Sequence, residues 1–242
     1  MGGKEIAAKM KTISVVIPAW NERDGIEKTI RAIPKSELGS AGYEVQILVV
    51  DGGSDDGTAE LAREAGAEVI IEPRRGYGRA YKTGFAAAKG DIIVTTDADS
   101  TYPTEDIPRL VQMLEDEKLD FITSNRFALM EKGAMSFRNK VGNMVLARET
   151  RLLFGLNMKD PESGMWVFRR NLLDRLKLNS NNNTFSHEIK IEACYFNKCR
   201  WREVPIRYEA RSGGSAKLTS GWRGWKAGFA DLFHIAKKRI VR

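Results

Sequence analysis

The chain has 242 residues, enough to bury one large core or two small ones. Its 42% hydrophobic and 29% charged residues are typical of a soluble globular protein. The sequence contains no apolar run of about 18 residues, so no membrane span is predicted. The net charge of +7 lies in the last 32 residues, which carry eight Lys or Arg and one acid. A neutral body with a basic tail argues against a nucleic-acid-binding protein and favours a local anionic partner.

The ends of the chain and its rare residues bear on location. Residues 1–5 (MGGKE) lack the apolar stretch of a secretory signal, which favours a cytoplasmic protein. Cys194 and Cys199 have neither C-x-x-C spacing nor further partners, so reduced thiols are expected. His187 and His234 stand in no metal-binding motif, and we do not predict metal ligation by them.

Apolar, β-branched runs alternate with helical patterns from Thr12 to Asn125. This alternation predicts a doubly wound α/β fold with a mainly parallel sheet and helices on both faces. Strands are expected over residues 12–18, 46–51, 68–71 and 120–125, with another beginning at 92, and the helices between them are expected to end near residues 32, 65, 90 and 117.

One of these strands ends in two carboxylates. Ile92, Ile93 and Val94 are typical of a buried central strand, and Asp97 and Asp99 follow. In an extended chain, residues two apart share a face, so both carboxylates are expected to point at one target. Such a pair favours a divalent cation, Mg²⁺ or Mn²⁺, completed by water and phosphate oxygens. A solvated acidic turn is the simpler alternative, but open α/β sheets bind ligands at this edge.

The second half of the chain is less regular. We expect a loop over residues 127–133, helices over 134–154, 171–176 and 184–196, and strands over 165–168 and 200–206. From Gly221 onward, aromatic and aliphatic residues recur at three- and four-residue steps between basic residues. This pattern predicts a C-terminal amphipathic helix that either lies in the headgroup layer of a membrane or packs on the core.

Six segments, in this order, resemble the inverting family 2 glycosyltransferases with a GT-A fold, and within them the dolichyl-phosphate mannose or glucose synthases. They are residues 16–22 (VIPAWNE), 50–58 (VDGGSDDGT), 97–99 (DAD), 124–126 (SNR), 160–164 (DPESG) and 211–218 (RSGGSAKL). Each motif is weak alone, but together they span nearly all of the chain. By contrast, the glycines at 76 and 78 lack the third glycine of a dinucleotide fingerprint, which argues against a Rossmann dehydrogenase.

The resemblance implies roles for individual residues. Asp97 and Asp99 would hold Mn²⁺ or Mg²⁺ against the diphosphate of a nucleotide sugar, and Arg126 would act with them as a catalytic group. The nucleotide would lie among Pro18, Trp20, Glu22 and Asp51. The sugar and the acceptor phosphate would meet Arg138, Ser163, Gly164, Glu188, Arg211 and Lys217, together with Arg126. Thr101 stands where relatives with a third metal-binding side chain often have Gln, which is a departure from the pattern.

The implied reaction is metal-dependent transfer of a hexose, with inversion, from GDP-mannose, UDP-glucose or UDP-N-acetylglucosamine to dolichyl or polyprenyl phosphate. A phosphate nucleophile, with a second pKa of about 6, needs positioning cations and no general base. A family 2 enzyme acting on a saccharide or protein hydroxyl is the alternative, and it would need a base such as Asp160 or Glu188. A sugar nucleotidyltransferase and a non-catalytic module are further alternatives, of which the first would need a Gly-rich loop after the first strand.

The expected organisation is a GT-A domain over residues 1–210 and a basic, aromatic-rich appendage over 211–242. Because the implied acceptor is a membrane lipid, we expect a protein at the cytoplasmic face of the membrane. It would be held there by the C-terminal helix or by a membrane-spanning partner subunit.

Overall fold

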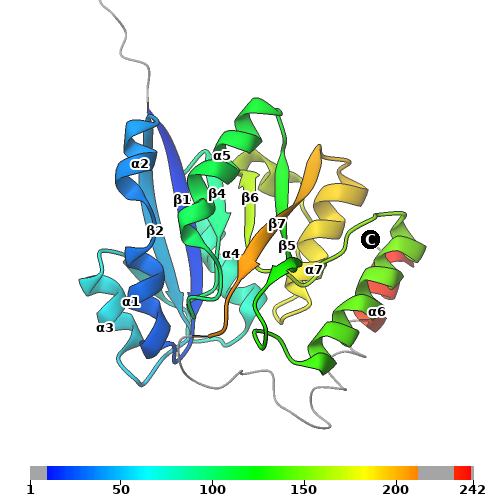
Figure 1. Cartoon of the computed structure of the whole chain (residues 1–242), viewed down its shortest axis with the longest axis horizontal. Helices are drawn as coiled ribbons and strands as arrows, with labels where there is room; N and C mark the ends of the chain where they lie inside the picture. The colour runs from blue at the N-terminus through cyan, green and yellow to red at the C-terminus, as the bar shows by residue number, and fades with distance from the viewer. Residues whose placement is uncertain (1–9, 212–231, 241–242) are drawn as a thin grey trace, which may run out of the picture.

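A computed structural model describes residues 10–211 and 232–240 (Figure 1). These residues form a seven-stranded sheet of order β3-β2-β1-β4-β6-β5-β7 with helices on both faces. Neighbouring strands are parallel except for β6, which is antiparallel to β4 and β5. The predicted mainly parallel, doubly wound sheet is confirmed. The strands are β1 (Lys11–Ala19), β2 (Tyr43–Asp51), β3 (Glu68–Ile71), β4 (Ile92–Thr95), β5 (Phe121–Met130), β6 (Trp166–Arg169) and β7 (Trp201–Tyr208).

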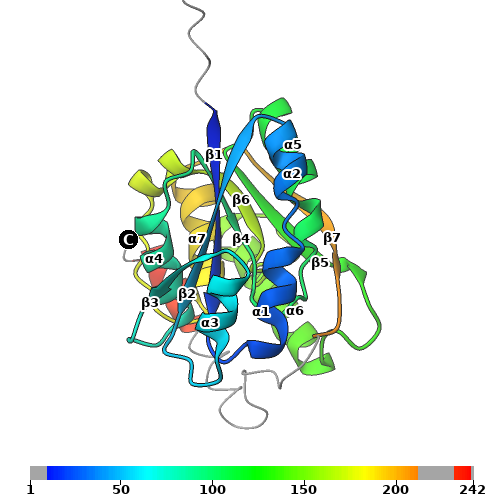
Figure 2. The ribbon, with the colours of Figure 1, turned by 90° about the vertical axis from the view of Figure 1, so that its left-hand side faces the viewer.

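The helices cover the sheet in two layers. One hydrophobic cluster joins one face of the sheet to α1, α2, α3 and α5, and a second joins the other face to α4, α6 and α7. Figure 2 shows α4 and α7 on the side opposite to α1 and α5. The α-helices are α1 (Arg23–Arg31), α2 (Lys35–Ser40), α3 (Thr58–Glu64), α4 (Tyr77–Ala87), α5 (Ile107–Asp116), α6 (Phe137–Phe154) and α7 (Phe185–Ile191), accompanied by the short 3₁₀ segments η1 (Thr104–Asp106) and η2 (Arg170–Arg175) and the π-helical turn η3 (Glu192–Phe196).

Alternation along the central strands explains the two layers. Val15 and Ile17 of β1 belong to the first cluster, whereas Val16 between them belongs to the second. The same holds in β4, where Ile93 and Val94 face opposite clusters. Strands that are apolar on both faces are stable only when helices cover both.

The structure corrects the loop that was expected to begin at residue 127. Residues 127–130 were expected in a loop, but β5 continues to Met130. After an irregularity beyond Asn125, Leu129 and Met130 pair with Arg207 and Tyr208 of β7. Backbone pairing with β7 thus extends β5 where its side chains are no longer buried, so the hydrophobic pattern did not reveal it.

The described part of the C-terminal tail, residues 232–240, is helical. Ile235 is fully buried in the second cluster, and Arg239 Nε donates to the Leu153 carbonyl of α6 at 3.0 Å. This stretch therefore packs on the body, while the rest of the predicted helix, with Trp222 and Trp225, lies outside the described residues. None of the helices in the described ranges is long and apolar enough to span a bilayer.

Candidate active site

Asp97 and Asp99 lie at the edge of the sheet where β1, β2 and β4 end. The strand β4 stops at Thr95, so the two carboxylates stand in the turn that follows rather than in the strand. Strand alternation therefore does not bring them together, and the turn does. Burial and the neighbouring charge of Asp99 raise the pKa of Asp97 to about 7. The negative charge of one carboxylate therefore opposes ionisation of the other.

Helix α1 fixes this turn from one side. A Cβ on Gly25 would lie 2.7 Å from the Ala98 carbonyl oxygen and 2.7 Å from Asp99 Cα, so only glycine allows this approach. The Ser100 hydroxyl donates to the Gly25 carbonyl at 3.0 Å, and the Ser100 amide donates to Thr29 Oγ1 at 3.1 Å. The backbone that carries Asp99 is thus fastened to α1.

Thr101 binds Asp99 directly. Its hydroxyl donates to Asp99 Oδ1 at 2.7 Å and its amide donates to the same oxygen at 3.2 Å. The residue that departs from the family pattern therefore orients a carboxylate of the pair.

The DPESG segment forms another wall of the site. A Cβ on Gly164 would lie 2.5 Å from Tyr77 Oη and 3.1 Å from Asp97 Oδ1, so Gly164 backs directly onto this carboxylate. Its amide donates to Tyr102 Oη at 2.7 Å, and its carbonyl accepts from Thr95 Oγ1 at 2.7 Å. Ser163 is fully buried and its hydroxyl contacts the Ser124 hydroxyl.

Arg126 forms a buried ion pair with Asp160. Its Nε donates to Oδ2 and its Nη2 to Oδ1, both at 2.7 Å, and its amide donates to Oδ2 at 3.0 Å. Although burial favours the neutral acid, Arg126 lowers the pKa of Asp160. Asp160 is fully buried, so it is poorly suited to take a proton from an acceptor hydroxyl. The positive charge of Arg126 reaches Asp97, whose pKa it lowers against the larger effects of burial and Asp99.

Arg211 connects the carboxylate turn to the end of β1. Its Nη2 lies 2.7 Å from Asp99 Oδ2, and its Nη1 donates to both oxygens of Glu22 at 3.2 Å. Residues far apart in the chain, from the 16–22 and 211–218 motifs, thus meet at one point.

The predicted nucleotide residues lie at the ends of β1 and β2. Pro18 pairs with Val50 in the parallel register, and Trp20 is 37% exposed with the Arg75 guanidinium 4.4 Å from its ring centre. Asp51 is buried and accepts from the Gly53 and Ser54 amides and from the Ser54 hydroxyl. Asp51 therefore shapes the turn after β2.

The donor set fits a divalent cation of the Mg²⁺ or Mn²⁺ type. Carboxylate oxygens are the ligands these ions prefer, and a cation would favour the ionised form of Asp97 that burial and Asp99 now oppose. Within residues 10–211 and 232–240, no group of three or more His, Cys, Asp or Glu is placed to hold a metal. An ion held by Asp97 and Asp99 would complete its shell with oxygens from water and the ligand.

The model of a known family matches this chain. The description of that family is "Glycosyl transferase family 2", and the match covers residues 14–177, from β1 to just beyond η2. The chain belongs to glycosyl transferase family 2.

Among the relatives of this chain are two proteins that are named as transferring sugars to lipid phosphates and one that is named as a hexosyltransferase. The dolichyl-phosphate hexose transferase of Haloferax volcanii is 34% identical over 203 residues, which cover 83% of this chain and 84% of that protein. The hexosyltransferase Agl6 of the same organism is 33% identical over 217 residues, but this chain spans only 52% of its length. The undecaprenyl-phosphate 4-deoxy-4-formamido-L-arabinose transferase of Salmonella paratyphi B is 34% identical over 220 residues, 88% of this chain and 64% of that protein.

A solved structure shares the fold of this family 2 enzyme. Glucosyl-3-phosphoglycerate synthase from Mycobacterium tuberculosis, in complex with Mg²⁺ and uridine diphosphate, superposes with a TM-score of 0.72. It is 26% identical, and the alignment covers 93% of this chain and 79% of that one. The GT-A architecture expected from the sequence is thereby confirmed.

The remaining predicted site residues are Glu188, Arg138 and Lys217. Glu188 is fully buried on α7, where it accepts from the Ser180 amide at 2.8 Å and pairs with Lys238 Nζ at 2.8 Å. Glu188 thereby ties α7 to the C-terminal helix, and its contact with the acceptor stays a prediction. Arg138 lies in the first turn of α6, and Lys217 lies outside the described residues.

Sequence reasoning missed three residues that shape the site. Tyr77, the first residue of α4, donates to Asp97 Oδ1 at 3.1 Å, and the sequence around it drew attention only for its glycines. Tyr102 accepts from the Gly164 amide at 2.7 Å. Lys190 is fully buried on α7 and donates to the carbonyls of Asp160, Pro161 and Ser163 at 3.3, 2.6 and 2.7 Å. The helical pattern around Lys190 gave no sign that its ammonium group would be enclosed.

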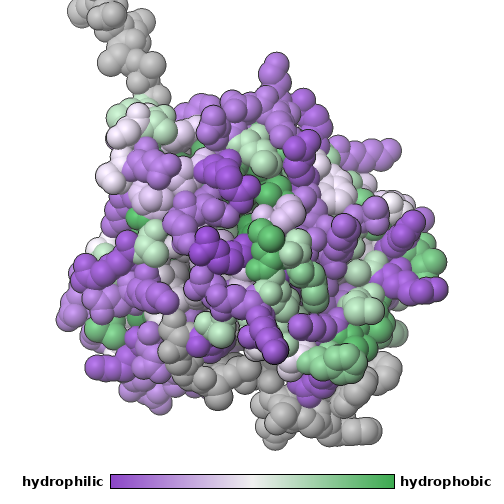
Figure 3. All heavy atoms as spheres, in the orientation of Figure 1, coloured by the Kyte–Doolittle hydropathy of each residue, from purple (hydrophilic) through white to green (hydrophobic). Residues whose placement is uncertain are grey.

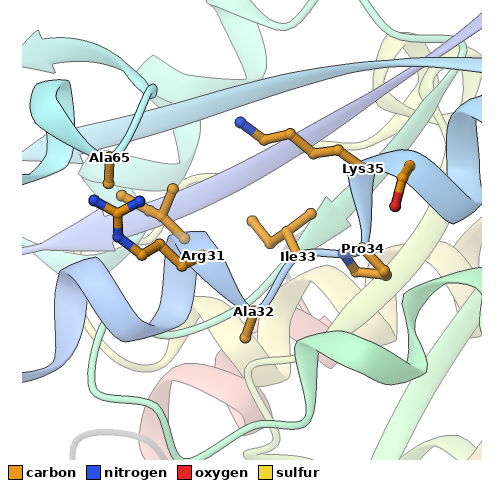
Figure 4. Close-up of a pocket in the computed structure, with 8 residues that line it drawn as sticks. Arg31, Ala32, Ile33, Pro34, Lys35 and Ala65 are labelled. Atoms are coloured by element: carbon orange, nitrogen blue, oxygen red, sulfur yellow. The ribbon is translucent and has the colours of Figure 1, made fainter.

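A surface pocket elsewhere involves none of the predicted site residues. It is lined by residues 30–36 and Ala65, including Arg31 and Lys35 (Figure 4). It lies at the end of α1 opposite to Glu22 and Gly25, and its lining contains no carboxylate.

Proposed function

We propose that this family 2 glycosyltransferase transfers a hexose from a nucleotide sugar to the phosphate of a polyprenyl lipid, with inversion at the anomeric carbon. The observation that carries the proposal is that Asp97 and Asp99 lie at one edge of the sheet, where Arg211 contacts Asp99 and the charge of Arg126 acts on Asp97. The names of relatives that cover most of the chain support a polyprenyl phosphate as acceptor.

The carboxylate pair would serve the leaving group. The chemistry that a divalent cation supplies when bound there is an offset of the negative charge on the departing diphosphate. Asp97 and Asp99 would hold it, with Tyr77 and Thr101 orienting their oxygens. Pro18, Trp20, Glu22 and Asp51, at the ends of β1 and β2, would border the base and ribose. The neighbour crystallised with Mg²⁺ and uridine diphosphate supports this assignment.

The arginines would serve the acceptor. A phosphate monoester is mostly dianionic at neutral pH and attacks without losing a proton to the protein. Its placement needs cationic donors, and a guanidinium binds phosphate through two parallel hydrogen bonds. Arg126 is held in one orientation by Asp160, and Arg211 by Glu22 and Asp99. Arg138 and Lys217 would contribute further positive charge, and Ser163 and Gly164 would border the sugar.

The same geometry weighs against a hydroxyl acceptor. Such an enzyme needs a general base near the sugar, and the two candidates were Asp160 and Glu188. Both are fully buried and ion-paired, Asp160 with Arg126 and Glu188 with Lys238. Neither would be available as a base, which favours an acceptor that arrives already ionised.

We further propose a catalytic domain over residues 1–210 and a membrane-directed appendage over 211–242. An acceptor embedded in a bilayer requires the enzyme to work at the membrane surface. A peripheral position at the cytoplasmic face, alone or with a membrane-spanning partner subunit, would satisfy this requirement.

The test is incubation with labelled GDP-mannose, UDP-glucose or UDP-N-acetylglucosamine, dolichyl phosphate and Mn²⁺ or Mg²⁺. We expect one donor to give a labelled lipid with the opposite anomeric configuration, and chelation to abolish its formation. Absence of lipid product with every donor, or full activity in chelator, would contradict the proposal.

A further inference from the structure

Helix α6 exposes more large apolar side chains than any other described element. Five of its side chains point away from the body, whereas the other exposed large hydrophobic residues of the described chain are scattered over several elements. The five are Phe137 (82% exposed), Val141 (38%), Met144 (65%), Val145 (48%) and Leu152 (75%). Figure 3 shows hydrophobic atoms gathered over α6.

The spacing of these residues puts them on one stripe. At 3.6 residues per turn, positions 137, 141, 144, 145 and 152 fall within an arc of about 100° and so share one helix face. The opposite face, with Asn143, Leu146, Thr150 and Phe154, is buried against the body. At 1.5 Å per residue, the apolar stripe is about 22 Å long. The face of α6 that carries the apolar stripe therefore points away from the body, while the opposite face packs against it.

The charges on α6 are almost all positive. The helix carries four basic residues and one acid, Glu149. The four are Arg138, Lys140, Arg148 and Arg151, which alternate with the apolar positions or flank them. A second copy of the same face would bring these cations against one another and offer few acids to pair with them. An apolar stripe with basic flanks instead matches a bilayer surface that contains anionic lipids.

The position of the stripe connects it to the site. The strand β5 is antiparallel to β6, which is antiparallel to β4, so β5 and β4 end at the same edge of the sheet. Arg126 lies on β5, β5 ends at Met130, and the stripe begins at Phe137. Figure 1 shows α6 starting at this end of the molecule.

We propose that this face of α6 is a docking surface for a membrane with anionic headgroups. It would hold the edge that carries Arg126 against the bilayer that supplies the acceptor, a consequence that rests on the proposed function. The stripe differs from the predicted C-terminal anchor, because in residues 232–240 Ile235 and Lys238 pack on the body.

Vesicle co-sedimentation of the full chain tests the proposal. The variant Phe137→Ser/Met144→Ser/Leu152→Ser removes apolar area from the stripe and touches no proposed site residue. Burying one such side chain is worth about 1.5 kcal/mol, or about tenfold in partitioning, so three should reduce binding at least about a hundredfold. The control is Met10→Ser/Ile71→Ser, which removes side chains that are 45% and 50% exposed and lie outside both α6 and residues 211–242.

The expected result is strong binding of the wild type to phosphatidylcholine vesicles that contain phosphatidylglycerol, loss of binding in the α6 variant, and little change in the control. Unchanged binding of the α6 variant, or an equal loss in the control, would overturn the proposal. Equal binding to pure phosphatidylcholine would overturn the role of anionic headgroups. A dimer in sedimentation velocity that the α6 variant dissociates would assign the face to a second copy.

A second readout separates this proposal from the proposed function. The α6 variant should still transfer sugar to a short-chain, water-soluble polyprenyl phosphate at the wild-type rate. A wild type that binds vesicles but transfers to no lipid phosphate would contradict the proposed function and leave the docking surface supported.

Discussion

Replacing Asp160 by Asn removes the negative charge that faces the Arg126 guanidinium and leaves the shape of the side chain almost unchanged. Arg126 is 11% exposed and Asp160 is fully buried, and two hydrogen bonds of 2.7 Å join them. Removing one partner of such a buried pair leaves an uncompensated charge and costs about 3–5 kcal/mol. We expect this loss in Asp160→Asn and a similar loss in Arg126→Met, out of a total stability of about 5–15 kcal/mol.

The double variant Arg126→Met/Asp160→Asn leaves no unpaired charge. It should therefore be more stable than the sum of the single losses predicts, by about 2–3 kcal/mol. Urea unfolding followed by tryptophan fluorescence measures all three variants against the wild type. Single losses that add within about 0.5 kcal/mol would refute the buried ion pair as an energetic unit.

The pH dependence gives an independent check on the same pair. The folded-state pKa of Asp160 is lowered, so its stabilising effect is present above the unfolded value of about 3.9 and is lost as pH falls toward the folded value. The difference in stability between wild type and Asp160→Asn should therefore shrink below about pH 4. A difference that stays constant down to the lowest pH at which the protein folds would contradict this account.

Three further variants or conditions test the carboxylate turn. Asp99→Asn should reduce the transfer rate by about 10²–10³ with a small change in stability, and wild-type turnover in this variant would exclude the proposed role. Gly25→Ala would place a methyl group 2.7 Å from the Ala98 carbonyl oxygen and shift the Asp99 backbone. We therefore expect kcat/KM to fall and the free energy of unfolding to fall by about 1–3 kcal/mol. An unchanged Tm would show that α1 can move away from the turn and would contradict this expectation. Because a proton competes for Asp97, whose pKa is raised to about 7, Mn²⁺ binding by calorimetry should weaken about tenfold from pH 8 to pH 6, and equal affinity at both values would contradict this.

The sequence predicted the parallel core of the sheet because its strands are apolar on both faces. The runs that became β1, β2 and β4 are nearly continuous in Val and Ile, which is typical of buried parallel strands. The reversed direction of β6 left no such mark, since a short apolar strand reads the same in either direction. Its direction follows from chain connection and pairing, which local patterns do not contain.

The site was predicted unevenly for a related reason. Asp97 and Asp99 could be located because they follow a strand, although the turn rather than the strand unites them. The pairing of Asp160 with Arg126 and the enclosure of Lys190 depend on contacts between segments more than 25 residues apart. Propensity and periodicity act over shorter ranges, so only the fold could reveal these contacts. The outward stripe of α6 was hidden because its composition alone did not tell which face would pack.

In the proposed reaction, cations at the edge of the sheet present an ionised lipid phosphate to a nucleotide-bound sugar. Its most direct test compares the wild type with matched polyprenyl phosphate and unphosphorylated polyprenol, using the same labelled nucleotide sugar and Mn²⁺. We expect transfer to the phosphate alone, and we expect Arg211→Ala to reduce it strongly. Transfer to the unphosphorylated polyprenol that equals or exceeds transfer to the phosphate would contradict the proposed reaction.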